Sequence, residues 1–360
     1  MMLTSGVLAA FLFTALAAPA PAEELDPRVE AFWVLVHEPA VIDELKLSDD
    51  QKARFLPLRD GWDLKFFPIR NKPAEVAQPA FTGLVTEVRE TLKQTLDEAQ
   101  QKRLLELELR RLGTDSFLQP EVEAFLKLTD SQKTRIRAII AETRDALKQA
   151  NAKAREEKSS QQLLEGKLKS LKINEQKKVL ERLTQVQRDG WKKMVGETFD
   201  VDKLSRQTFR APELVDTGKW INSDGVKPDE LKGKVVVVHF YACGCINCIH
   251  NYPAYLDWQS RFRGQDFVMV GVHTPETLAE RDIAKVKEKA AAEKFEFPVL
   301  IDVDSKNWDA WGNSIWPTVY LIDKAGRLRT YWTGELNWEG ATGEAQMRKR
   351  IEELIAEPGP

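Results

Sequence analysis

The pattern of apolar and polar positions divides the chain into two halves. Residues 25–204 are rich in Leu, Lys, Glu, Gln and Arg, which favour helices, and their apolar positions recur at helical spacing. From residue 234 onward, short runs of β-branched and aromatic residues alternate with amphipathic segments, a pattern typical of buried strands and covering helices. We therefore predict two domains, an all-α half and an α/β half, that join near Ser205.

The helical half repeats itself. Residues 27–32 match residues 120–125, and residues 45–54 match residues 126–135 almost position for position. A repeat of this kind indicates two copies of one supersecondary unit. The simplest interpretation is a duplicated helical hairpin, with four main helices in all.

Each repeat contains a hydroxyl residue followed three positions later by glutamine, namely Ser48 with Gln51 and Thr129 with Gln132. This spacing predicts a capping box, which needs no function beyond starting a helix. The second run also resembles the L-T-x-x-Q motif of the Spy/CpxP-like periplasmic helical proteins; the first fits with serine for threonine, and residues 96–100 match more loosely. The resemblance implies an envelope protein, with chaperone or stress-related binding as one role and a structural or partner-docking domain as the other.

The C-terminal half predicts an alternation of strands and helices that ends in a hairpin. The turn at residues 323–326 separates the last two strands. The predicted strands are residues 234–241, 267–272, 297–301, 318–322 and 328–333, and the predicted helices are residues 249–262, 277–294 and 344–356.

All three cysteines of the chain, Cys243, Cys245 and Cys248, lie between the first strand and the first helix of this half. A scaffold held by disulfides would spread an even number of cysteines along the sequence. A helix N-terminus favours the thiolate form, because its dipole and free N–H groups stabilise negative charge. The cluster therefore predicts reactive sulfur chemistry rather than structural cross-links.

Several residues around the cluster carry a family resemblance. The run Cys245-Ile-Asn-Cys248 resembles the active site of the thioredoxin fold, and Pro253 lies where that family kinks its helix. The pair Trp316-Pro317 precedes the hairpin, at the position of the family's cis-proline. Further stretches between residues 211 and 355 resemble the TlpA/DipZ-like redoxin branch and the thioredoxin-like module of NHL-repeat proteins.

The resemblance implies a role for each of these residues. Cys245 is expected to be the attacking thiolate and Cys248 the resolving thiol, so that the redox-active group is their disulfide and no cofactor is needed. Pro317 is expected to bring its neighbours' backbone groups beside the nucleophile, where an incoming peptide pairs with them. Trp316 is expected to shield the site.

Two residues depart from the family pattern. His239 stands where the family usually has a buried carboxylate, and it either accepts the proton of the resolving thiol or only fills the strand. Cys243 adds a third thiol just before the nucleophile, as an alternative disulfide partner or as a bystander.

A metal site is the competing interpretation of the cysteine cluster. Cys243, Cys245, Cys248 and His250 form a C-x-C-x-x-C-x-H run, and three thiolates with one imidazole suit zinc or Cu(I). A third possibility is a non-catalytic envelope chaperone or binding protein whose thioredoxin-like half serves only as a docking platform.

The N-terminus and the charge balance bear on location and partners. Residues 1–22 have a short apolar core and an A-x-A end, which predicts a signal peptide and an exported protein of the periplasm or envelope; an uncleaved N-terminal anchor is the alternative. The domains would then be residues 23–205, helical, and residues 206–360, thioredoxin-like. The net charge of −3 does not favour nucleic acid. Expected partners are protein thiol or disulfide substrates and a redox partner protein, with client or dimer contacts through the helical half.

Overall fold

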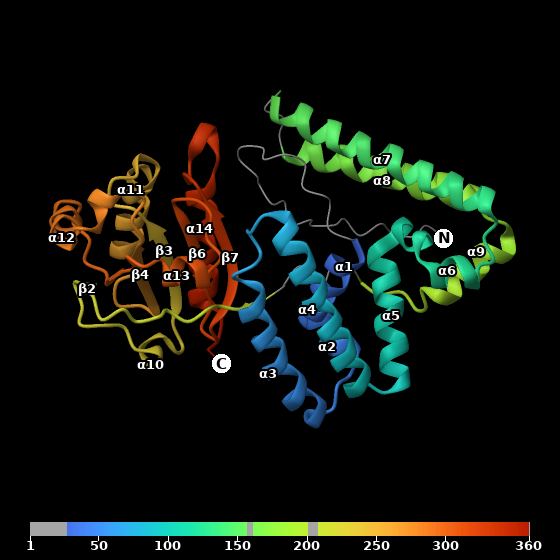
Figure 1. The fold of residues 1–360 in the computed structure, drawn as a ribbon, viewed down its shortest axis with the longest axis horizontal. Helices are drawn as coiled ribbons and strands as arrows, with labels where there is room; N and C mark the ends of the chain where they lie inside the picture. The colour runs from blue at the N-terminus through green and yellow to red at the C-terminus, as the bar shows by residue number, and fades with distance from the viewer. Residues whose placement is uncertain (1–26, 157–160, 201–207, 360) are drawn as a thin grey trace. The chain divides into compact units, whose positions relative to one another are not determined.

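The computed structural model describes residues 27–156, 161–200 and 208–359 (Figure 1). Residues 27–194 are helical, and residues 209–333 contain a single sheet, which confirms the predicted fold classes. The predicted signal peptide at residues 1–22 lies outside the described residues. None of the helices within the described ranges has the length and apolar character needed to cross a membrane.

The N-terminal region contains four long helices, as the repeat predicts, together with shorter ones that the sequence analysis did not resolve. The bounds are α1 Pro27–Val36, α2 Pro39–Glu44, α3 Asp49–Phe66, α4 Ala74–Thr95, α5 Glu98–Leu112, α6 Pro120–Phe125, α7 Asp130–Glu156, α8 Gln161–Glu181 and α9 Gln185–Met194, with a 3₁₀ helix η1 at Gly113–Leu118. The four long helices are α3, α4, α7 and α8.

The short helices α2 and α6 identify where each repeat begins. Both span six residues and start with proline, and both end at a leucine cap, Leu45 or Leu126. The next residue is left-handed in both copies, with φ 50° at Lys46 and 51° at Lys127. The structural counterpart of α6 is therefore α2. It is not α1, although the sequence of α1 matches that of α6 more closely. The repeating unit is α2–α5, followed by α6–α9.

Glutamines of the capping boxes bind one another in pairs. The Gln51 amide donates to the Gln100 side-chain oxygen at 2.7 Å and accepts from it at 3.0 Å. Gln132 and Gln187 repeat this exchange at 2.8 and 3.1 Å. Each of these glutamines also completes the capping box of its own helix. The box of Gln187 starts at Thr184, in a further L-T-x-x-Q run that the sequence analysis missed. The motif therefore joins two helix starts as well as capping each.

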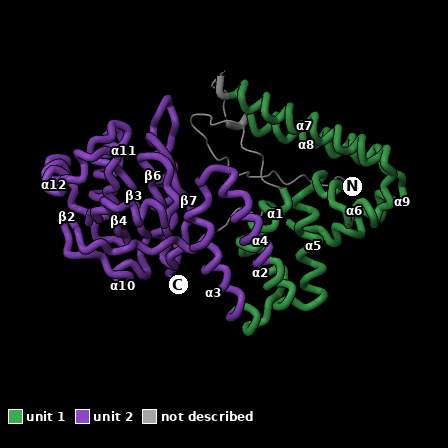
Figure 2. The backbone as a smooth tube through the Cα atoms, viewed as in Figure 1, with its two compact units in different colours: residues 1–52, 89–206 green, residues 53–88, 207–360 purple. Residues whose placement is uncertain are grey.

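Contacts between residues divide the chain into two compact units (Figure 2). One unit comprises the described parts of residues 1–52 and 89–206, and the other comprises residues 53–88 and 207–360. Most of α3 and most of α4 thus group with the sheet. The domain boundary at residues 205 and 206 stays a prediction of the sequence.

The sheet of the second unit has seven strands in the order β1-β7-β6-β3-β4-β5-β2. Strands β3, β4 and β5 are parallel, whereas β6 runs antiparallel to both β3 and β7. The strand bounds are β1 Phe209–Arg210, β2 Trp220–Ile221, β3 Val235–Tyr241, β4 Phe267–His273, β5 Val299–Ile301, β6 Thr318–Ile322 and β7 Arg327–Thr333. The helix bounds are α10 Pro228–Leu231, α11 Ile246–Arg261, η3 Leu278–Arg281, α12 Ile283–Ala292, α13 Lys306–Ala310, η4 Trp338–Gly340 and α14 Gly343–Ala356.

All seven residues of β3 are buried, because the strand lies in the middle of the sheet with a core on each face. Val235 and Val237 pack with side chains of α11, α12 and α14. Val236 and Val238 face the opposite core, to which Phe67 contributes from the segment between α3 and α4. A strand buried on both faces reads as a continuous apolar run, and this is why the sequence shows it so clearly.

Residues 53–88 pack on the sheet through polar as well as apolar contacts. The Arg70 guanidinium donates to the Tyr320 hydroxyl and lies 4.9 Å from the centre of the Tyr331 ring. The Asp63 carboxylate accepts the backbone N–H of Arg210 at 2.6 Å. These contacts join positions up to 250 residues apart in the chain, so no local pattern predicts them.

Two helix boundaries differ from the predictions. The helix expected at residues 277–294 is divided into η3 and α12, because the Asp282 carboxylate accepts the N–H of Ala284 and caps a new helix there. The helix expected from residue 249 begins three residues earlier, at Ile246, so that the cysteines lie within and just before its first turn.

The glutamine pairs predict a specific loss of stability. The Gln132→Ala variant loses its box and its bond to Gln187, so we expect its free energy of unfolding to fall by about 1–3 kcal/mol. Gln149, exposed on the same helix, is the matched control, and its alanine variant should change stability by less than about 0.5 kcal/mol. Urea unfolding measures both, and equal effects would contradict the structural role of the pair.

Candidate active site

The cysteines lie where the central strand β3 gives way to α11. Cys245 is the N-cap of α11, and its sulfur accepts the backbone N–H of Cys248 at 3.4 Å. Cys245 is 9% exposed, whereas Cys248, one turn into the helix, is fully buried. Cys245 is therefore the more exposed residue of the pair.

The two thiols have opposite electrostatic environments. A hydrogen bond from the Cys248 side chain, together with the backbone N–H groups of Cys248 and Asn247, lowers the pKa of Cys245 to about 7. Burial and the hydrogen bond to Cys245 raise the pKa of Cys248 far above its usual range. All three cysteines are free thiols in this structure. In this reduced state, Cys245 is the thiol that ionises near neutral pH.

Trp316 and Pro317 immediately precede β6, and the peptide bond between them is cis. Trp316 packs against the buried cluster that includes Cys245 and Cys248. The Trp316 indole N–H donates to the Thr274 carbonyl at 3.1 Å, and its ring stacks on Trp308 with centres 4.0 Å apart. The N–H of Thr274 in turn donates to the carbonyl of Tyr241 at 3.0 Å. Thr274 thus links Trp316 to Tyr241, the last residue of the strand that precedes the cysteines.

Asn251 connects α11 to the segment that contains Pro317, and the sequence analysis did not single it out. Its amide donates to the Gly334 carbonyl at 3.1 Å and accepts the N–H of Leu336 at 2.8 Å. The N–H of Gly334 donates to the Pro317 carbonyl at 2.7 Å. Asn251 is 2% exposed and lies three residues after Cys248. The sequence shows an asparagine in this helix but not the partners, 83 and 85 residues away, that give it a role.

Glu280 is a second residue that the sequence analysis missed. One carboxylate oxygen accepts the N–H of Gly244 at 2.6 Å, and the other accepts the N–H groups of Glu276 and Thr277 at 2.9 and 2.8 Å. Burial alone would raise the pKa of Glu280, but these hydrogen bonds outweigh it and lower the pKa below its usual range. Glu280 is therefore an ionised carboxylate bonded directly to the cysteine loop.

His239 is fully buried in β3 and is surrounded by aromatic rings. Its ring centre lies 4.5 Å from Tyr255 and 5.1 Å from Tyr241, and neither ring nitrogen has a hydrogen-bond partner among the described residues. Burial lowers the pKa of His239 to about 3. The imidazole is consequently neutral at physiological pH and a weak base. Of the two roles considered from the sequence, this environment favours filling the strand.

The residues of the alternative metal site do not converge. The His250 imidazole pairs with the Glu335 carboxylate at 3.0 Å and is half exposed. Cys243 is half-buried, and burial, followed by the Glu280 carboxylate, raises its pKa. Within the part of the chain that the structure describes, no group of three or more His, Cys, Asp or Glu side chains is arranged to hold a metal ion.

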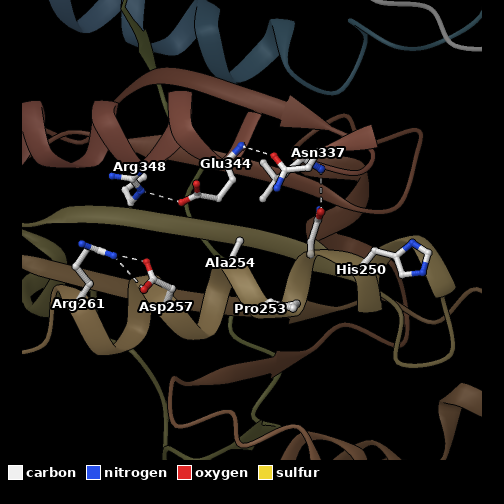
Figure 3. Close-up of a pocket in the computed structure, with 10 residues that line it drawn as sticks. His250, Pro253, Ala254, Asp257, Arg261, Asn337, Glu344 and Arg348 are labelled. Atoms are coloured by element: carbon white, nitrogen blue, oxygen red, sulfur yellow. Dashed lines mark hydrogen bonds and ion pairs between the residues drawn. The ribbon is translucent and has the colours of Figure 1, made fainter. Parts of the chain in front are cut away.

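His250 instead lies at the end of a cavity of about 460 Å³ between α11 and α14 (Figure 3). Charged side chains along this cavity pair with one another on their own helices, Asp257 with Arg261 and Glu344 with Arg348. The charged groups that line the cavity are therefore already paired with neighbours on their own helices.

The comparisons with known proteins match the part of the chain that contains the sheet. Residues 209–331 match the model of the AhpC/TSA family. They form a thioredoxin-like domain. The protein DipZ of Mycobacterium bovis is 36% identical over 128 residues, which cover 35% of this chain and 18% of DipZ. The thiol-disulfide oxidoreductase YkuV of Bacillus subtilis is 28% identical over 146 residues, covering 41% of this chain and 94% of YkuV.

A solved structure, described as the solution structure of a thioredoxin-like protein in the oxidized form, is 29% identical. It covers 42% of this chain and 96% of its own, with a TM-score of 0.36. This chain thus spans less than a fifth of DipZ, and the matched part is the thioredoxin-like domain. The Spy/CpxP-like character of the helical half stays a prediction.

Removing the Asn251 side chain tests its role in holding the segment around Gly334. Asn251→Ala leaves a partly buried carbonyl and a buried N–H without this partner, so we expect a loss of about 1–3 kcal/mol in stability and faster hydrogen exchange at Leu336. Asn247→Ala, an exposed position one turn earlier, is the stability control. Urea unfolding and amide exchange check both, and unchanged exchange at Leu336 would contradict the assignment.

The buried His239 predicts a pH dependence of stability. Its pKa is 6.5 when unfolded and about 3 when folded, so unfolding takes up a proton below pH 6.5. Stability from the neutral imidazole is full above pH 6.5 and is lost as the pH falls toward 3, by on the order of 4–5 kcal/mol. His239→Leu should remove this component.

The control for this measurement is the wild type itself, because His273 is also buried with a lowered pKa and titrates in the same direction in both proteins. The difference between the two stability curves therefore isolates His239. Parallel curves for wild type and variant between pH 6.5 and pH 4 would show that His239 is not buried in its neutral form.

Proposed function

We propose that this protein is an exported thiol-disulfide oxidoreductase that exchanges disulfides with protein substrates through Cys245 and Cys248. The observation that carries the proposal is the contrast between the two thiols. Cys245 ends the loop before α11 with a pKa of about 7, while Cys248 is fully buried and keeps its proton. Such a pair supplies one nucleophile and one resolving group from a single helix turn.

The reaction follows from this division of roles. The Cys245 thiolate attacks one sulfur of a substrate disulfide; a bond forms between the two sulfurs, and the second substrate sulfur leaves as a thiolate. Cys248, after losing its proton, attacks the Cys245 sulfur of this mixed disulfide and releases the remaining substrate thiol. Two electrons pass from the protein to the substrate, and the protein becomes the Cys245–Cys248 disulfide. The reverse sequence oxidises a substrate dithiol.

Protein substrates are favoured over small ones by the surroundings of Cys245. Pro317 and Trp316 lie in a backbone segment held at the ends of the central strands, where an extended peptide can pair with main-chain groups. The similarity to the protein named thiol-disulfide oxidoreductase YkuV supports the same class of reaction. A redox partner protein would restore the starting state of the dithiol after each turnover.

The location and the helical half complete the proposal. Residues 1–22 have the features of a signal peptide, and an exported protein meets an oxidising compartment in which disulfide exchange is useful. The helical half would then select clients or form dimers, as its resemblance to Spy/CpxP-like proteins implies.

Trapping of the mixed disulfide tests the proposal. The Cys248→Ser variant keeps the nucleophile and lacks the resolving thiol, so it should accumulate mixed disulfides with insulin, whose disulfides Cys245 attacks. The Cys245→Ser variant should form none at this position and should lose at least about a hundredfold in insulin reduction. Mass spectrometry of peptides locates the trapped cysteine.

The same preparations distinguish the alternatives. Metal content and free thiols are measured after purification without reductant. Stoichiometric zinc or copper with three protected thiols would replace the proposal by a metal-binding function. Absence of both turnover and trapped intermediates in metal-free protein would replace it by a non-catalytic binding role.

A further inference from the structure

We propose that Glu280 is a positioning residue that decides which cysteine attacks, by holding the turn Cys243-Gly244-Cys245 and placing its negative charge beside Cys243. This inference rests on the proposed function, in which Cys245 is the nucleophile. It addresses a question that the sequence leaves open, namely why two thiols separated by a single glycine do not compete for the same substrate.

Glu280 connects the turn that contains Gly244 to the residues just before η3. Its first oxygen accepts the N–H of Gly244, 36 residues earlier, and its second oxygen accepts the N–H groups of Glu276 and Thr277, just before η3. Its backbone carbonyl lies 2.9 Å from the imidazole Nε2 of His273, at the end of β4. Because Glu280 is only 6% exposed and is bonded at both oxygens, the cysteine loop is fixed relative to the sheet.

Gly244 lies so close to the Glu280 carboxylate that a side chain at this position would contact it. A Cβ atom built at this position would lie 2.9 Å from the Glu280 carboxylate oxygen, closer than side chains normally approach. The φ angle of Gly244 is not in the left-handed region, so the requirement comes from the approach of the carboxylate. A side chain at position 244 would displace this carboxylate oxygen, so glycine here leaves the hydrogen bond from Gly244 to Glu280 undisturbed.

A carboxylate suits this position better than an amide. Both oxygens of Glu280 accept backbone N–H groups, and a carboxylate has two acceptors. A glutamine would place its NH₂ group against one set of these donors. Glutamine also lacks the negative charge of glutamate but has the same length. The Glu280→Gln substitution therefore removes the charge without shortening the side chain.

The charges around Cys243 favour its protonated form. Burial and then the Glu280 carboxylate raise its pKa, and the Lys289 ammonium opposes them. The other titratable groups coupled to Cys243 are the buried hydroxyls of Tyr241 and Tyr252, which stay protonated. For Cys245 the acting carboxylate is Glu276 instead. Each thiol thus has its own acidic neighbour, and this provides a matched pair of variants.

The experiment uses the reduced full-length chain and iodoacetamide as the probe, with alkylation of each cysteine followed by mass spectrometry from pH 6 to 10. Glu280→Gln should raise the rate at Cys243 near pH 7 by about threefold or more, because the thiolate fraction rises when the nearby negative charge is removed. Glu276→Gln, the matched control, should instead raise the rate at Cys245. The ratio of Cys243 to Cys245 labelling therefore moves in opposite directions.

A second variant keeps the inference falsifiable if Glu280→Gln loosens the fold. Glu280→Asp retains the charge but is one methylene shorter, so Cys243 should stay slow while the Gly244 amide exchanges faster with solvent. In the Cys248→Ser background, oxidised glutathione should be trapped on Cys245, and adding Glu280→Gln should move a measurable fraction to Cys243.

An unchanged labelling ratio in Glu280→Gln, or the same change in Glu280→Gln and Glu276→Gln, would overturn the inference. Alkylation requires no disulfide substrate, so these results are independent of the proposed function. Conversely, failure of the wild type to react with any disulfide would refute the proposed function while the alkylation ratios still test the role of Glu280.

Discussion

The donation of the Cys248 N–H and thiol to the Cys245 sulfur is the interaction on which the site depends. It places the partial positive charge of a helix start next to one sulfur and brings the pKa of Cys245 to about 7, while the second sulfur stays buried and protonated. The difference between the two pKa values depends on the positions of these donors, so the turn must be rigid. The central strand β3 supplies its base, and Asn251 and Glu280 each hold one side of it through buried hydrogen bonds.

The sheet that supports this turn is covered on both faces, and different parts of the chain cover the two faces. One is covered by the helices α11, α12 and α14 of the thioredoxin-like domain itself. The other receives Phe67 and Arg70 from residues 53–88, which are helical in sequence character and group with the sheet by contacts. The remaining helical residues form their own unit, in which paired glutamines join the starts of successive helices. The duplication visible in the sequence is thus a duplication of caps as well as of helices.

Local patterns predicted the parts of the molecule that depend on neighbours in sequence. The buried strand β3, the hairpin of β6 and β7, the cysteines at a helix start and the cis bond before Pro317 all follow from residues within a few positions of one another or from a family resemblance. Asn251 and Glu280 could not be found in this way, because their partners lie 83 and 36 residues away. His239 stands out in the sequence as a departure from the family pattern, but only its complete burial in the structure lowers its pKa and makes it a weak base.

The most direct test of this account is the ionisation of the individual thiols in the reduced protein, followed by the ultraviolet absorbance of the thiolate in Cys243→Ser/Cys248→Ser and Cys243→Ser/Cys245→Ser chains. We predict that the chain retaining Cys245 titrates below the ordinary thiol range, because the helix N–H groups remain and the serine hydroxyl at position 248 replaces the thiol as donor. The chain retaining Cys248 should show no thiolate up to pH 9. Titration of Cys248 below Cys245 would contradict the assignment of nucleophile and resolving thiol.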